Sequence, residues 1–125
     1  MSAPRIARSE LQLLEKLWEL GPSSVREVHG SLPEESRPAY TTVQTMIYRL
    51  EQKEAVKRIK KIGTAHIFQA AFTRRNVYRK LVNDLLELFG GSVAPVMSHL
   101  VETGKLTLAD LREAEKLLNE SKERR

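Results

Sequence analysis

The spacing of apolar residues changes once in the first half of this chain, just after Ala55, and that change restricts the folds available to it. Before it, apolar residues recur at intervals of three and four and predict a helix buried on one face: Val43, Met46, Ile47 and Leu50. After it, in "VKRIKKIGTAHIFQA", polar and apolar residues alternate on both sides of Gly63. This alternation predicts a β-hairpin whose first strand is basic.

Two short helices are expected ahead of the helix that opens at Tyr40 or Thr41. Ser9 with Gln12 has the spacing of a capping box and begins a helix over 9–20, which Gly21 and Pro22 end. Ser24 with Glu27 repeats the spacing and begins a second helix carrying Val25, Val28 and Leu32. The first part of the chain is therefore predicted to be three helices followed by a hairpin.

The remainder is predicted to be helical, with helices after Thr73, after Ser92 and, capped by Thr107 and Asp110, to near the end of the chain. Its first helix is apolar over so much of its circumference that it needs cover on more than one side. A second copy of the chain is the favoured cover, and the alternative is that the last helices fold back onto the first part. The residues expected at a dimer contact are Val77, Leu81, Leu85, Leu88, Phe89, Leu108, Leu111 and Leu118.

These patterns give the fold class. We expect a mainly α protein with a small β-hairpin wing, in which residues 1–72 form a winged helix-turn-helix DNA-binding domain and 73–125 a helical dimerisation domain. A length of 125 residues suits one modest core or two small ones. We find neither a membrane-spanning run nor a secretory signal, so a cytoplasmic protein without membrane insertion is expected.

Positive charge is concentrated in one segment. The chain carries a net charge of +5, and residues 37–61 alone hold seven Arg or Lys against two Asp or Glu. A clustered basic surface suits a polyanion, because each neutralised phosphate releases condensed counterions. A solvated basic face that serves solubility is the alternative on charge alone.

The third helix keeps uncharged polar residues on the face opposite its apolar stripe. Gln can pair with adenine through two hydrogen bonds, and Thr methyls can contact the thymine methyl group. The residues expected to read bases are Thr41, Thr42, Gln44, Thr45, Tyr48 and Arg49. Those expected at the DNA backbone, where contacts fix position without specifying sequence, are Arg8, Ser9, Lys53, Lys57, Arg58, Lys60, Lys61 and His66.

Enzyme chemistry has no support in the sequence. The absence of cysteine excludes disulfides, thiolate nucleophiles and thiolate zinc sites. His29, His66 and His99 are isolated from one another, and no Gly-rich phosphate loop or catalytic motif is present. We therefore predict no catalytic residue, no metal and no cofactor.

Three stretches of the chain resemble the penicillinase-repressor family, the BlaI/MecI/CopY-type winged-helix transcriptional repressors. They are "SELQLLEKLWELGPSSVREV", "AYTTVQTMIYRLEQK" and "HIFQAAFTRR", and the resemblance extends over nearly the whole length. It implies a homodimer that binds a palindromic operator and represses a resistance or sensor gene. In the antibiotic-responsive branch, a membrane-bound sensor metalloprotease relieves repression by cleaving the C-terminal module. A winged-helix adaptor that binds a protein instead of DNA is the alternative function.

The chain departs from the family pattern at several positions. Glu54 stands where the family usually has Gly after the third helix, so that helix is expected to end differently. The wing tip is Gly63-Thr64 rather than Gly-Arg, which removes a phosphate contact, and the absent Cys-x-Cys hook excludes copper sensing by that route. The expected cleavage region aligns near Ser98, His99 and Leu100, where the family's Asn-Phe pair is missing.

Overall fold

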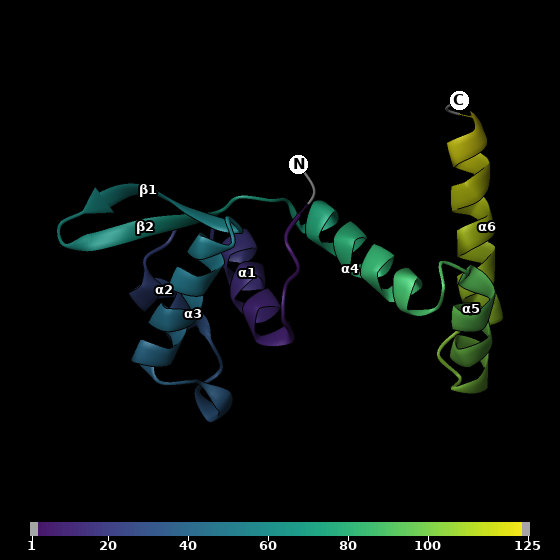
Figure 1. Ribbon diagram of the computed structural model, residues 1–125, viewed down its shortest axis with the longest axis horizontal. Helices are drawn as coiled ribbons and strands as arrows, with labels where there is room; N and C mark the ends of the chain where they lie inside the picture. The colour runs from purple at the N-terminus through teal and green to yellow at the C-terminus, as the bar shows by residue number, and fades with distance from the viewer. Residues whose placement is uncertain (1–2, 124–125) are drawn as a thin grey trace. The chain divides into compact units, whose positions relative to one another are not determined.

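The computed structural model describes residues 3–123 and divides the chain into two compact units, Met1–Val82 and Asn83–Arg125 (Figure 1). The elements of the first unit are α1 (Arg8–Leu20), α2 (Val25–Ser31), a 3₁₀ turn η1 (Glu34–Ser36), α3 (Tyr40–Gln52), β1 (Val56–Ile62), β2 (Ala65–Ala70) and the first half of α4 (Arg74–Leu88). The second unit holds the rest of α4, α5 (Val93–Glu102) and α6 (Leu108–Glu123). The predicted order of three helices, a hairpin and three helices is confirmed, as is the fold class.

Local hydrogen bonds explain where the helices begin. The Ser24 hydroxyl accepts from the Glu27 amide at 3.2 Å while Glu27 accepts from the Ser24 amide at 3.0 Å, which confirms the capping box predicted for α2. The cap predicted for α1 at Ser9 is wrong. That helix begins at Arg8, with Ala7 as its cap residue, because the Glu10 carboxylate accepts from the Ala7 amide at 2.9 Å and so satisfies a donor two residues before Ser9.

The core of the first unit lies between α1, α2, α3 and the base of the hairpin. Its largest fully buried side chains are Phe68, Leu14, Ile47, Leu50, Val28, Val43, Val56 and Val77. Burial of each such side chain contributes about 1.5–3 kcal/mol. Met46, predicted with this buried face, is only half-buried at its edge. Val77 of α4 belongs to the same core, so the apolar packing of this unit continues past residue 72.

The end of α3 corrects one expectation. The helix ends in the usual Schellman pattern, in which the Ala55 amide donates to the Leu50 carbonyl at 2.9 Å and the Glu54 amide to the Glu51 carbonyl at 2.9 Å. Glu54 itself has φ 64°, and within residues 3–123 it is the one non-glycine residue with positive φ. The helix therefore ends as a Gly-terminated one would, with Glu54 in the left-handed conformation.

The hairpin follows directly. Its strands pair antiparallel with Ile62 opposite Ala65, which leaves the two-residue turn Gly63-Thr64 with Gly63 at φ 61°. The pairing shifts between Arg58 and Lys60, so a bulge at Ile59 interrupts the alternation of the basic strand. Two backbone hydrogen bonds between Ser23 and Phe68, at 2.8 and 3.0 Å, fasten the wing to the segment before α2.

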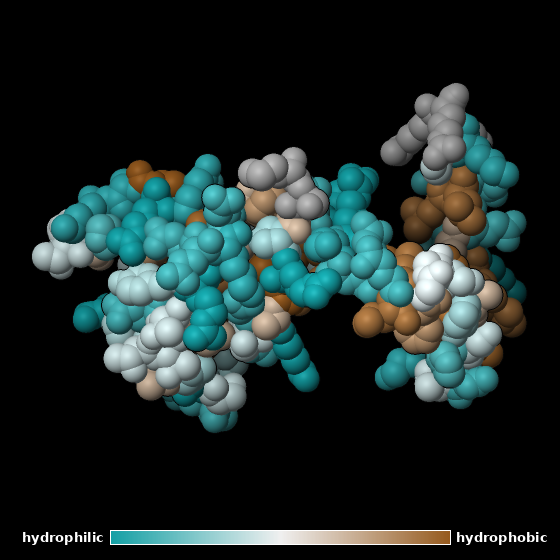
Figure 2. Space-filling model, in the orientation of Figure 1, coloured by the Kyte–Doolittle hydropathy of each residue, from teal (hydrophilic) through white to brown (hydrophobic). Residues whose placement is uncertain are grey.

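The second unit exposes much of its apolar surface. Among its described residues none is fully buried, and Leu88, Leu108 and Leu118 are 84%, 71% and 65% exposed. Apolar side chains gather on its helices (Figure 2). The reciprocal cap of α6 is confirmed, because the Thr107 amide donates to Asp110 at 2.9 Å and the Asp110 amide to Thr107 at 3.1 Å. No helix within residues 3–123 is long and apolar enough to cross a membrane.

Candidate nucleic-acid interface

The polar face of α3 is open to solvent. Val43, Ile47 and Leu50 are fully buried, and the residues predicted to read bases lie on the remaining circumference of the helix. All of them are exposed except Gln44, which is half-buried: Thr41, Thr42, Gln44, Thr45, Tyr48 and Arg49. The structure thus brings this predicted set together on one helix face.

Two of these side chains are held in place by hydrogen bonds within the helix. The Gln44 amide donates to the Tyr48 hydroxyl at 3.2 Å, and the Thr45 hydroxyl donates to the Thr41 carbonyl at 2.9 Å. The second N–H and the carbonyl oxygen of Gln44, and the hydroxyl proton of Tyr48, have no partner among the described residues. Those groups are the donors and acceptors that a base edge requires.

The wing is joined to this face through Arg58. Its guanidinium lies 5.2 Å from the centre of the Tyr48 ring and 5.3 Å from that of Phe68. Its Nε donates to Glu51 of α3 at 2.7 Å, which makes an ion pair between β1 and the last turn of the helix. A cation over an aromatic face contributes about 0.5–1 kcal/mol at such a partly exposed site. Arg58 was predicted at the DNA backbone, and in this arrangement its charge is balanced within the protein.

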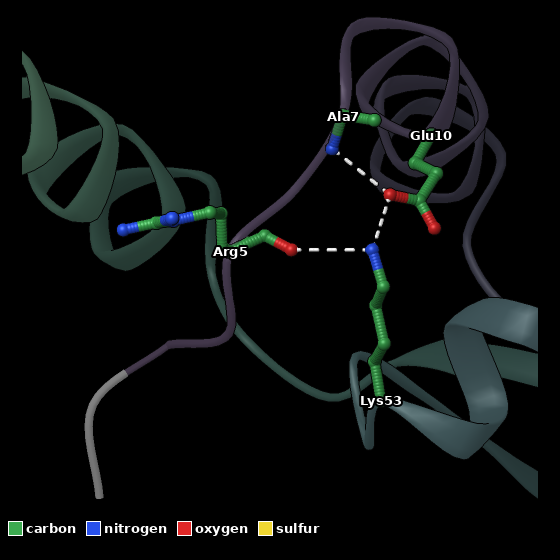
Figure 3. Close-up of polar contacts among 4 residues, drawn as sticks. All are labelled: Arg5, Ala7, Glu10 and Lys53. Atoms are coloured by element: carbon green, nitrogen blue, oxygen red, sulfur yellow. Dashed lines mark hydrogen bonds and ion pairs between the residues drawn. The ribbon is translucent and has the colours of Figure 1, made fainter.

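Lys53, at the other side of the same helix end, is also paired. Its ammonium donates to the Glu10 carboxylate at 2.6 Å and to the Arg5 carbonyl at 3.3 Å, and the same Glu10 oxygen accepts from the Ala7 amide (Figure 3). Burial alone would raise the pKa of Glu10. The hydrogen bonds from Lys53 and Ala7, with the positive charges of Lys53 and Arg49, outweigh that effect and lower the pKa below its ordinary value.

Arg49, predicted to read bases, and four of the residues predicted at the DNA backbone carry charge that no carboxylate of the described residues balances. Within residues 3–123, no ion pair involves Arg8, Arg49, Lys57, Lys60 or Lys61, and all five side chains are exposed. Three of them, Lys57, Lys60 and Lys61, lie on β1 of the wing. Ser9 is exposed in the first turn of α1, and His66 is half-buried on β2 opposite Lys61.

Several grooves border α3. One of about 280 Å³ is lined by Thr41, Thr42, Thr45, Met46 and Arg49. Another, of about 440 Å³, lies between the start of α2, α3 and the wing. It is lined by Ser24, Val25, Arg26, Tyr40, Gln44, Tyr48, Thr64, Ala65, His66 and Phe68. Arg26 and Tyr40 were not among the predicted site residues. Arg26 could have been found from its place in the first turn after the Ser24 cap.

The residues predicted for dimerisation divide into two groups. Val77 is buried in the core of the first unit and Leu81 packs against that core, so neither side chain offers a free contact surface. The others are all exposed: Leu85, Leu88, Phe89, Leu108, Leu111 and Leu118. The region aligned with the family's cleavage site lies inside α5, where Ser98 and His99 are exposed and Leu100 is half-buried.

Comparison with known proteins identifies related regulators. The family described as "Penicillinase repressor" matches residues 6–120 of the chain. A protein named "Transcriptional regulator BlaI" from Mycobacterium tuberculosis (strain CDC 1551 / Oshkosh) is 32% identical over 101 residues. The aligned region covers 78% of this chain and 72% of the relative. The protein of the same name from strain ATCC 25618 / H37Rv matches with the same identity and coverage.

Proposed function

Because the chain belongs to the penicillinase repressor family of transcriptional regulators, we propose that it binds a palindromic operator as a homodimer and represses a resistance or sensor operon. The observation that carries this proposal is the polar face of α3 together with the neighbouring wing lysines Lys57, Lys60 and Lys61, which form no ion pair with a carboxylate of the described residues. The protein acts in the cytoplasm, where operator DNA is found. It is not an enzyme, as the family is a family of repressors.

The α3 face supplies sequence readout. A helix fits the major groove, and the side chains that point into it must discriminate between neutral base edges. Gln44, with one N–H bound to Tyr48, retains a second N–H and its oxygen for the two-bond pairing with adenine. Thr41, Thr42 and Thr45 offer methyl groups and hydroxyl acceptors, and Arg49 reaches guanine or phosphate from the same face.

The wing supplies affinity for the DNA backbone. Lys57, Lys60 and Lys61 are exposed along β1 and unpaired among the described residues, which suits contacts to phosphate oxygens. Arg8 and Ser9 at the start of α1, together with His66 and Arg26 beside the groove, extend the same role. Thr64 at the turn adds a hydroxyl but no charge. Each neutralised phosphate steepens the dependence of affinity on salt.

The second unit supplies dimerisation. Its exposed leucines form too much apolar surface for a small helical unit to leave in water, and a second copy of the same surface is the self-complementary cover that a palindromic site requires. We assign the contact to Leu85, Leu88, Phe89, Leu108, Leu111 and Leu118. Two recognition helices related by a two-fold axis then read half-sites about 10 base pairs, or a multiple of that, apart.

Relief of repression by a membrane sensor protease, as the resemblance implies, would act on α5. Ser98, His99 and Leu100 are helical, and proteases cut most readily at exposed loop tips, so cleavage there requires that α5 first unwinds locally. Limited proteolysis tests this step. Cutting within residues 98–100 of the folded protein supports it, and cutting confined to other positions argues for another inducing mechanism.

A binding experiment tests the function itself. Duplexes enriched from a random-sequence library by the full-length protein are compared with scrambled duplexes of equal composition, by fluorescence anisotropy at several salt concentrations. We expect a preference of at least about 10³-fold for the enriched duplex and a steep loss of affinity with salt. Thr45→Ala should reduce the preference, and Lys60→Ala should weaken binding to both duplexes alike. Weak, salt-independent and sequence-independent binding would instead favour a protein-binding adaptor.

A further inference from the structure

We propose that Lys53, at the end of the recognition helix, is a positioning residue held by Glu10 and not a ligand for phosphate. The inference deepens the proposed function and rests on it, because it concerns how α3 is presented to DNA. Lys53 follows the last residue of α3, and Glu10 lies in the first turn of α1, 43 residues away in sequence. Their ion pair therefore joins the start of one helix to the end of the other.

Two of the three N–H donors of the Lys53 ammonium already have acceptors. It donates to Glu10 at 2.6 Å and to the Arg5 carbonyl at 3.3 Å, and these two acceptors fix both its position and its charge balance (Figure 3). Glu10 is 4% exposed, so this carboxylate has little water to stabilise it if the lysine leaves. A phosphate that drew Lys53 away would leave the buried Glu10 carboxylate unpaired, which costs more than recruiting an unpaired lysine such as Lys60.

The end of α3 is fixed from two sides. On one side Lys53 connects it to α1 through Glu10, and on the other Glu51 connects it to the wing through Arg58 at 2.7 Å. The two acceptors, Glu10 and Glu51, come from different elements, and both cations were expected at the DNA backbone. Since Gln44 and Tyr48 stand on this helix, a small rotation of α3 would displace the groups that read bases.

The hydrogen bonding of Glu10 is incomplete, so folding stability alone is a poor explanation of this ion pair. Its second carboxylate oxygen is buried and has no hydrogen-bond partner among the described residues. An incompletely satisfied buried ion pair is often no more stabilising than an apolar pair of the same size, whereas it does specify one arrangement. The pair therefore suits a function in which the orientation of α3 matters more than the free energy of unfolding.

The variant Glu10→Gln separates the effect of the Glu10 charge from the effect of the position of α3, because the two should change DNA binding in opposite directions. Removal of a negative charge near the interface strengthens DNA binding if only electrostatics matters. Loss of the anchor of α3 weakens binding to the specific duplex if position matters. Glu19→Gln is the matched control, because Glu19 is an exposed carboxylate on the same helix whose only partner among the described residues is Lys16 at 3.4 Å.

The experiment uses the full-length protein with a duplex enriched from a random library and its scrambled counterpart. Anisotropy titrations over a salt series are run well below the melting temperature of each variant. We expect Glu10→Gln and Lys53→Met each to weaken binding to the enriched duplex roughly 3- to 30-fold and to lower its preference over the scrambled one. The salt slope should stay at the wild-type value, while Lys60→Ala lowers it by about 0.9 for each bound chain.

Three results would overturn the inference while the proposed function stands. Lys53→Met could lower the salt slope as Lys60→Ala does, which would make Lys53 a phosphate ligand. Glu10→Gln could strengthen binding to both duplexes as Glu19→Gln does, which would reduce its role to charge. Both variants could melt earlier yet bind like the wild type, which would make the pair purely structural. Failure of the wild type to prefer the enriched duplex would overturn the proposed function itself, and the inference with it.

Discussion

Replacement of Glu54 by Gly should stabilise the N-terminal unit, because Glu54 holds a backbone conformation that glycine adopts without a steric cost. At φ 64° the Cβ of an L-residue meets its own backbone, at a cost of about 1–2 kcal/mol. Glycine gains more conformational freedom in the unfolded chain, which offsets about 0.4–1 kcal/mol of that benefit. The net expectation is an increase of about 1 kcal/mol in the free energy of unfolding.

The effect should be visible in thermal melting. For a unit of this size, 1 kcal/mol corresponds to about 4–8 °C in melting temperature. Protein concentration must be the same for every variant, because dimerisation makes the melting temperature depend on it. Urea unfolding at 25 °C provides the free energy directly.

Glu54→Ala is the matched control, since it removes the same charge and side chain but keeps the Cβ. It should leave the free energy of unfolding within about 0.5 kcal/mol of the wild type. Gly63→Ala should lower stability by about 1 kcal/mol, because Gly63 has φ 61°. An added Cβ would meet no residue beyond its chain neighbours within 4 Å, so backbone strain alone sets this cost. If Glu54→Ala stabilised as much as Glu54→Gly, the charge of Glu54 and not its backbone conformation would be responsible for the effect.

Three further outcomes are expected from the same structure. Glu10→Gln should lower stability by about 1–3 kcal/mol at pH 7. Because the folded pKa of Glu10 is lowered, this difference should shrink as pH falls below about 4.3 and through the folded pKa, in urea unfolding over a pH series. Phe68→Ala should cost about 3–5 kcal/mol, whereas Ile62→Ala at an exposed position should change little. Leu111→Glu with Leu118→Glu should yield monomers in sedimentation, and a persistent dimer would move the contact elsewhere.

Short-range patterns in the sequence were sufficient for most of the fold. The caps at Ser24 and Thr107 depend on residues three positions away, so their hydrogen bonds could be predicted from spacing. The hairpin was predicted because Gly63 separates two alternating runs. The bulge at Ile59 could not be predicted, because it depends on which residue of β2 each residue of β1 faces.

Long-range contacts account for the errors. The α1 cap was placed at Ser9 because Ser is a strong cap residue, but Glu10 accepts from Ala7 and also holds Lys53 from the distant end of α3. The end of α3 was expected to change at Glu54 because a left-handed glutamate is strained. The burial of Leu50 and Ala55 on either side outweighs that strain. The Ala7–Glu10 hydrogen bond spans only three residues, but the contact of Glu10 with Lys53 and the burial of Leu50 and Ala55 cannot be seen in a local window.

The sequence predicted which residues form the candidate interface, but not which of its cations are paired within the protein. The uncharged face around Gln44 and Thr45 followed from helical spacing, and the structure places those side chains at the surface. The pairing of Lys53 with Glu10 and of Arg58 with Glu51 did not follow, because partners that are distant in sequence determine whether a cation is available to DNA. Which residues contact bases or phosphates stays a prediction.

Selection from a random duplex library with the wild type and with Gln44→Ala tests whether the face of α3 reads DNA sequence. The wild type should select two inverted half-sites. Gln44→Ala should select the same half-sites with the preference lost at one adenine-containing position in each, since Gln44 provides the two-bond contact. An unchanged preference at every position, or no enriched sequence for the wild type, would contradict sequence readout by this face.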